Sequence, residues 1–107
     1  MKELKYYKTK NNKIPFLDWL DKLKDKQVIK KIFNKLTNLI AGNFGDHHGV
    51  GEGVQELRFK NGIRIYYGEE NQTIVILLLG GNKSNQQKDI ELAKLYWKDH
   101  KNNFGGK

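Results

Sequence analysis

The sequence predicts an α+β domain in which a sheet of about four strands is combined with three helices. Apolar residues recur at helical spacing in residues 15–40 and then alternate in residues 54–79. Helical spacing returns in residues 84–100. A chain of 107 residues is long enough for one hydrophobic core and too short for two. We therefore expect a single domain over residues 1–101 and a flexible C-terminal tail over residues 102–107.

The N-terminal third is expected to form one strand and a helical hairpin. Residues 2–9 alternate loosely and predict the strand. Pro15 fits the first turn of a helix, where its missing N–H is harmless, and residues 16–23 continue the helical spacing. A second helix with one apolar stripe is predicted over residues 28–40, and Gly42 ends it.

The remainder predicts a loop, three strands and a last helix. Residues 42–53 contain five glycines and are expected to form the loop. The third strand is apolar on both faces, which is typical of a central, covered strand. Ser84 and Gln87 have the spacing of a capping box, so we expect the last helix to begin at Ser84. Its inner face carries Ile90, Ala93 and Trp97, and the three strands are expected over residues 54–60, 63–67 and 73–79.

The turn at Asn61-Gly62 decides which side chains of the central hairpin share a face. A two-residue turn would mix charged and apolar side chains on both faces. A three-residue loop with Gly62 in the left-handed conformation pairs Phe59 with Ile63 and separates them. We predict the second register, because burial strongly specifies strand register. The apolar face then holds Leu57, Phe59, Ile63, Ile65 and Tyr67, and the other face holds Glu56, Arg58, Arg64 and Tyr66.

This register places Arg58 and Arg64 directly opposite each other. Two like charges in such a pair repel, so an anion is expected between them. The anion is either a bound phosphate or the carboxylate of Glu56, and the pattern of residues leaves both open.

Charge and composition bear on partner and compartment. The net charge is +8, and residues 1–35 hold eleven lysines against four acidic residues. Such a basic half favours a nucleic-acid partner, although lysines also serve solubility alone. The chain has no cysteine, no apolar run long enough to span a membrane, and no apolar segment of a secretory signal in MKELKYYKTK. We therefore expect a cytoplasmic protein with no membrane partner.

The segment from Glu52 onward resembles the RelE/ParE toxin superfamily, and in particular its HigB-like branch of "addiction module killer proteins". The resemblance covers roughly residues 3–98 and rests on the order and spacing of short motifs. They are Pro15-Phe16-Leu17-Asp18-Trp19-Leu20, Gly45-Asp46, Glu56-Leu57-Arg58, Ile63-Arg64-Ile65-Tyr66-Tyr67, Leu79-Gly80-Gly81, Asn82-Lys83-Ser84 and Asp89-Ile90.

The resemblance implies two N-terminal helices and a C-terminal helix packed on a twisted, mostly antiparallel sheet. It also implies the toxin of a type II toxin-antitoxin system, usually an enzyme that cuts mRNA on the ribosome. The expected partners are the ribosome, mRNA and a cognate antitoxin, typically a helix-turn-helix protein. From charge we expect that antitoxin to be acidic or to carry an amphipathic segment that covers the basic surface.

RNA can be cut without a metal or cofactor when its own 2′-OH attacks the adjacent phosphate. This reaction needs a base, an acid and cations around the phosphate. The resemblance implies functional cations at Arg64 and Lys83, and Arg58 shares the face of Arg64. Arginine suits the role because its planar guanidinium group matches phosphate oxygens.

The acid and base are harder to identify. Histidine is the side chain most often used to carry protons at physiological pH, so His47 and His48 are candidate proton carriers, or they are ordinary exposed loop residues. With Asp46 they are spaced too tightly for a standard zinc site, so no metal is expected. Tyr66 is a candidate for stacking on an RNA base. RelE-type enzymes often use a tyrosine near the last helix, and Asp89 occupies that place here.

Two other functions remain open from the sequence. One is a ParE-like toxin that inhibits DNA gyrase by contact, without chemistry. The other is a regulatory module that binds nucleic acid or an antitoxin. Cations that converge on one sheet face favour the nuclease, whereas scattered cations favour a binding protein. Trp19 and Trp97 are expected in the core rather than in a site.

Overall fold

The computed structural model describes residues 1–105 and confirms the α+β class. Three α-helices and five strands form the domain, together with two short helical turns. Their order is β1 (Glu3–Tyr6), α1 (Pro15–Asp21), α2 (Lys26–Ile40), β2 (His47–Gly51), β3 (Val54–Arg58), β4 (Ile63–Glu70), β5 (Ile74–Asn82), the 3-10 turn η1 (Lys83–Asn85), α3 (Gln86–His100) and the π-helical turn η2 (Lys101–Gly105). No helix among the described residues combines the length and apolar character that a membrane crossing requires.

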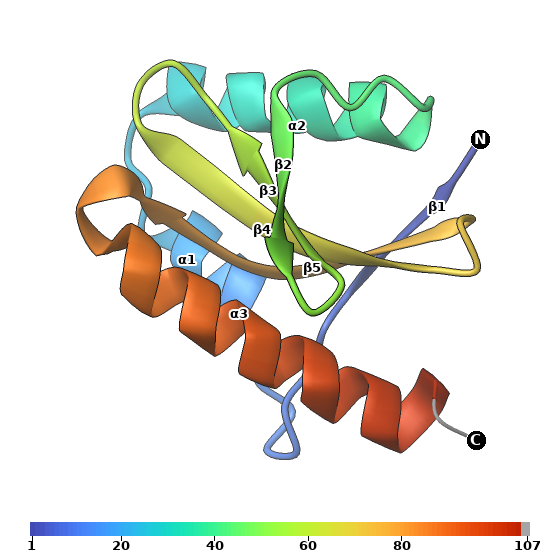
Figure 1. Ribbon diagram of the computed structural model, residues 1–107. Helices are drawn as coiled ribbons and strands as arrows, with labels where there is room; N and C mark the ends of the chain where they lie inside the picture. The colour runs from blue at the N-terminus through green and yellow to red at the C-terminus, as the bar shows by residue number, and fades with distance from the viewer. Residues whose placement is uncertain (106–107) are drawn as a thin grey trace.

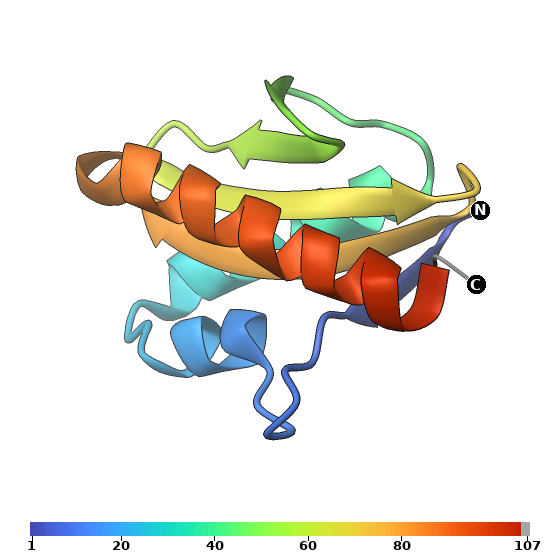
Figure 2. The ribbon, with the colours of Figure 1, turned by 60° about the horizontal axis from the view of Figure 1, so that its bottom comes forward.

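All five strands form one mixed sheet in the order β1-β5-β4-β3-β2. The pair β1 and β5 is parallel, and the other three neighbouring pairs are antiparallel. Helices α1 and α2 cover one face of the sheet and α3 crosses the other (Figures 1 and 2). The core is therefore divided into two layers, with β5 buried between them as its apolar character on both faces predicts.

The prediction of about four strands is wrong, because the glycine-rich segment contains a fifth. His47–Gly51 forms β2 and pairs with β3 at the edge of the sheet. Its side chains are almost all exposed, so the segment carries no apolar alternation that would reveal a strand. Main-chain hydrogen bonds to β3 define it instead.

The three-residue loop of the central hairpin is confirmed. The Phe59 N–H donates to the Ile63 carbonyl (2.9 Å), and Gly62 has a φ of 92°, which is the left-handed region that favours glycine. Arg58 pairs with Arg64, and Glu56 pairs with Tyr66. Leu57, Ile65 and Tyr67 pack in the layer under α1 and α2, while Tyr66 packs in the layer under α3.

The helix ends differ from the sequence prediction at the start of α3. Asn82, not Ser84, supplies the capping oxygen, which accepts a hydrogen bond from the Ser84 N–H (3.0 Å). The 3-10 turn η1 follows, and α3 begins at Gln86, so the capping box with Gln87 is wrong. At the other end, η2 continues from α3 through residue 105. Residues 106–107 of the predicted tail lie outside the described residues.

A β-bulge in β5 sets the alternation of the residues that follow it. Tyr66 pairs with Leu79 and Tyr67 with Leu77, which leaves Leu78 as the extra residue. Beyond the bulge, Gly80 therefore faces α1 and Gly81 faces α3. A Cβ on Gly80 would lie 2.2 Å from the Trp19 ring, so that indole packs directly on the strand backbone.

We predict that Gly80→Ala destabilises the protein. A methyl group cannot fit under the Trp19 ring, so we expect the free energy of unfolding to fall by about 2 kcal/mol. The matched control is Gly49→Ala, where a Cβ would meet only the Gln55 side chain at 3.6 Å. That control should change stability by less than about 0.5 kcal/mol. Urea unfolding measures both, and equal effects of the two substitutions would contradict the close packing.

Candidate functional site

A fully buried carboxylate, Glu56, lies at the centre of the polar face under α3. Its Oε1 accepts a hydrogen bond from Arg58 Nε (2.7 Å), and its Oε2 accepts one from the Tyr66 hydroxyl (2.9 Å). Gln86 Nε2, from the first turn of α3, donates to both carboxylate oxygens at 3.3 and 3.0 Å. Donors from β3, β4 and α3 thus satisfy one buried charge, as burial of an ion requires.

The two arginines of the predicted pair both approach this carboxylate. Arg64 Nε lies 3.6 Å from Glu56 Oε2, while its Nη1 donates to the Gly62 carbonyl (3.1 Å). The Arg64 side chain is 14% exposed and the Arg58 side chain 38% exposed, so more of the Arg58 side chain is open to solvent. Of the alternatives left by the sequence, Glu56 is the anion between the arginines. Its presence leaves guanidinium N–H groups of Arg58 available for another anion.

These contacts set the charges of the cluster. Burial alone would raise the pKa of Glu56, but hydrogen bonds from Arg58, Gln86 and Tyr66 outweigh it and lower that pKa. Burial, together with the hydrogen bond to Glu56, raises the pKa of the Tyr66 hydroxyl. The hydrogen bond to Glu56 raises the pKa of Arg58. Glu56 is therefore ionised and saturated with donors, so it positions the arginines rather than accepting protons.

Asp89 approaches the same face from α3. A Cβ on Gly81 would lie 2.0 Å from Asp89 Oδ2, and Gly81 is the strand partner of Arg64. Glycine at this position therefore lets the carboxylate reach the backbone of β5 beside Arg64. Burial raises the pKa of Asp89, and the nearby Lys88 only partly offsets this effect. A half-buried carboxyl group with a raised pKa is suited to proton exchange.

Lys83 lies at the same end of the sheet as the arginines. Its backbone N–H donates to the Gly62 carbonyl (2.9 Å), which also accepts from Arg64 Nη1. The aliphatic part of the Lys83 side chain packs over Gly62, and the residue is exposed. The Lys83 backbone and the Arg64 side chain thus donate hydrogen bonds to the same carbonyl oxygen, so the two residues are neighbours.

The two histidines lie on opposite faces of β2. His48 pairs with Glu56 and so belongs to the arginine face, where its Nε2 is 2.8 Å from Asp46 Oδ1. His47 pairs with Leu57 on the other face, and its ring lies tilted against Phe44, with 5.1 Å between the ring centroids. The structure therefore brings His48 toward the cluster and leaves His47 outside it.

Tyr66 and Gln86 differ most from the sequence interpretation. Tyr66 is fully buried and bonded to Glu56, so its ring has no exposed face on which a base could stack. Gln86 was missed, although the sequence holds a signal for it. Gln86 precedes Ile90 by four residues and lies on the inner stripe of α3, where a polar side chain needs a buried partner.

We predict that Glu56→Gln destabilises the protein by about 3 kcal/mol near neutral pH, because Arg64 loses its buried counter-charge. The lowered pKa of Glu56 fixes the sign of the pH dependence. Its stabilisation is present above the ordinary glutamate pKa and is lost as the pH falls through the lowered value. Stability curves of wild type and variant should therefore converge in acid.

Urea unfolding at several pH values tests this prediction. Glu91→Gln, an exposed substitution in α3, serves as the charge-matched control and should shift stability by less than about 0.5 kcal/mol. A constant difference between wild type and Glu56→Gln down to pH values below the ordinary glutamate pKa would refute the assigned role.

Comparison with known proteins places the chain in a family. No family model matches it. It is similar to a protein of Haemophilus influenzae (strain ATCC 51907 / DSM 11121 / KW20 / Rd) described as "Uncharacterized protein", with 45% identity over 84 residues. The match covers 77% of this chain and 85% of the relative. The chain belongs to the same family as this Haemophilus influenzae protein.

Proposed function

We propose that the protein is the toxin of a type II toxin-antitoxin system and cuts mRNA on the ribosome without a metal ion. The observation that carries the proposal is the pair of arginines held on one sheet face by the buried Glu56. Guanidinium groups that are fixed before substrate binds stabilise a phosphate transition state at little reorganisation cost. The basic charge of the chain and its resemblance to the RelE/ParE superfamily support the same conclusion.

In the proposed reaction the RNA 2′-oxygen attacks the adjacent phosphorus and the 5′-oxygen leaves. The 2′-OH loses its proton to a base, and the departing oxygen gains one from an acid, which yields a 2′,3′-cyclic phosphate. Arg58 and Arg64 bind the phosphate oxygens, and Lys83 adds positive charge beside them. Glu56 acts as a positioning residue for both arginines.

Asp89 and His48 are suited to the two proton transfers because they flank the arginines. Neighbouring strands lie about 4.8 Å apart, so a phosphate centred between β3 and β4 is about 7 Å from both β2 and β5. His48 extends from β2, and Asp89 covers Gly81 on β5. The attacking and leaving oxygens lie on opposite sides of phosphorus in an in-line displacement. We assign Asp89 as the proton acceptor and His48 as the donor.

A toxin of this type needs control by a partner. We propose a cognate antitoxin, of helix-turn-helix type by resemblance, with an acidic or amphipathic segment. Complementary charge would speed its association with so basic a protein.

We predict that Arg64→Ala abolishes mRNA cleavage. Removing one preorganised donor to the phosphate should lower the cleavage rate by about 100-fold or more. Arg64→Lys keeps the charge but loses the planar guanidinium group, so it should retain intermediate activity. The readout is mapping of mRNA 5′ ends in a translation reaction with purified ribosomes, together with growth after induction in cells.

Lys8→Ala, which changes an exposed residue of the N-terminal segment, is the control and should cut as wild type does. Circular dichroism checks that each variant folds. Intact mRNA together with broken DNA would instead indicate gyrase inhibition, and an absence of toxicity would indicate a regulatory module. Either result would overturn the nuclease proposal.

A second prediction concerns Asp89→Asn, which preserves shape and removes the titrating group. We expect the cleavage rate to fall by about 100-fold, as for loss of a general base. The acid limb of the rate-against-pH profile should also disappear, while ribosome binding stays unchanged. A variant that keeps both the wild-type rate and the acid limb would exclude Asp89 as the acceptor.

A further inference from the structure

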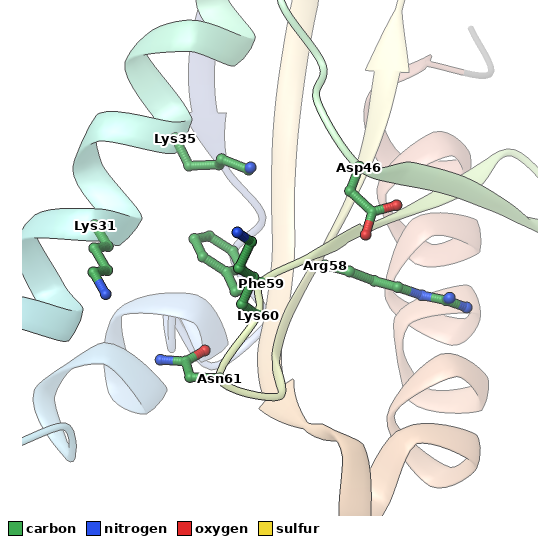
Figure 3. A pocket seen from close by; sticks show the side chains of 7 residues that line it. All are labelled: Lys31, Lys35, Asp46, Arg58, Phe59, Lys60 and Asn61. Atoms are coloured by element: carbon green, nitrogen blue, oxygen red, sulfur yellow. The ribbon is translucent and has the colours of Figure 1, made fainter.

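A second cationic feature lies on the opposite side of β3 from Glu56. It is a groove of about 630 Å³ between α2, the β3–β4 loop and the segment before β2. Figure 3 shows its lining: two lysines reach in from α2, and the hairpin loop supplies the opposite wall. The lining residues are Lys31, Lys35, Asp46, Arg58, Phe59, Lys60 and Asn61.

The charge of this groove is largely uncompensated. Lys31 and Lys35 are one helical turn apart, and α2 contains four lysines and no acidic residue. Across residues 1–105, no ion pair engages Lys31, Lys35 or Lys60. Lys35 Nζ instead lies 5.7 Å from the centroid of the Phe59 ring. Three lysines without an ion pair in this part of the chain therefore line the groove together with one carboxylate, Asp46, and the aromatic ring of Phe59.

Arg58 connects this groove to the candidate site. The stem of its side chain lines the groove, while its guanidinium end extends away toward α3 (Figure 3) and bonds to Glu56. The pairing of β2 with β3 starts at His47 and Leu57, so Arg58 is the first residue of β3 past the end of β2. Its N–H donates to the carbonyl of Asp46, the residue before β2 (2.9 Å). A polymer strand bound at the arginines can therefore pass around the end of β2 into the groove without crossing the sheet.

We infer that the groove binds the nucleotides next to the phosphate held by Arg58 and Arg64, so that single-stranded RNA extends from the arginine face into it. The inference rests on the proposed function, which identifies the bound polymer as RNA. Lys31, Lys35 and Lys60 contact its phosphates, and Phe59 and Asn61 contact a base. Binding of this kind combines a positive groove with aromatic side chains.

Continuity with the arginines favours RNA over an acidic peptide. A nucleic-acid strand carries one charge at each step and bases between the charges, which fits cations that alternate with an aromatic and an amide side chain. An acidic peptide would satisfy the lysines alone.

The test uses a groove variant, Lys31→Glu with Lys35→Glu and Lys60→Glu, in the full chain. The matched control, Lys8→Glu with Lys10→Glu and Lys24→Glu, changes net charge equally at exposed positions away from the groove. The probe is a fluorescein-labelled RNA of about 12 nucleotides, 2′-O-methylated so that it cannot be cut. Fluorescence anisotropy gives Kd at several salt concentrations, and circular dichroism confirms folding.

We expect the groove variant to weaken binding at least about 10-fold and to lower the salt slope by about 2, since each lost single-strand phosphate contact contributes about 0.7. The control should weaken binding less than about 3-fold. A probe of about three nucleotides, too short to reach the groove, should bind both variants equally. Equal losses for both variants with the long probe would show a net-charge effect and overturn the inference.

Two further outcomes separate this inference from the function on which it rests. Undiminished RNA binding by the groove variant, with loss of binding to a polyglutamate probe, would make the groove a peptide site and overturn the inference. If wild type still cuts mRNA on the ribosome in that case, the proposed function survives. If wild type cuts no mRNA but the groove variant alone loses RNA affinity, the groove stands and the nuclease proposal fails.

Discussion

The buried carboxylate of Glu56 is the constraint on which the polar half of this molecule depends. A charge removed from water must find donors inside the protein, and these come from β3, β4 and α3. The same carboxylate offsets the repulsion between two arginines that the hairpin register sets opposite each other. One group thereby joins the packing of α3 to the placement of the cations. The site can be complete only when strands and helix are assembled together.

The bulge and the glycines of β5 also shape the polar face under α3. The bulge at Leu78 shifts the alternation of β5 by one residue, so that Gly80 faces α1 and Gly81 faces α3. Gly80 admits the Trp19 indole on one face, and Gly81 admits the Asp89 carboxylate on the other. An ordinary residue at either position would hold its neighbour off the sheet. The approach of the Asp89 carboxylate to the strand beside Arg64 therefore depends on the missing side chain of Gly81.

The spacing of apolar residues along the sequence was enough to predict much of the fold. It gave the α+β class and the hairpin register, because Leu57, Ile65 and Tyr67 could share a face in only one pairing. It failed for β2, whose exposed residues hold no apolar pattern. It failed again at the start of α3, where Asn82 and Ser84 are both good capping residues and only the strand end decides between them. The burial of Tyr66 and the role of Gln86 depend on how α3 crosses the sheet, which is a tertiary property that local pattern does not encode.

The exposed edge strand β2 can change its side chains more easily than the rest of the sheet. His47 and His48 are placed by main-chain hydrogen bonds to β3, and their side chains are exposed. Neither histidine is among the buried residues of the two core layers. The fold therefore tolerates other side chains along β2 while Glu56 keeps the two arginines in place. Under the proposed function, a change at His48 would alter the proton donor without any accompanying loss of fold.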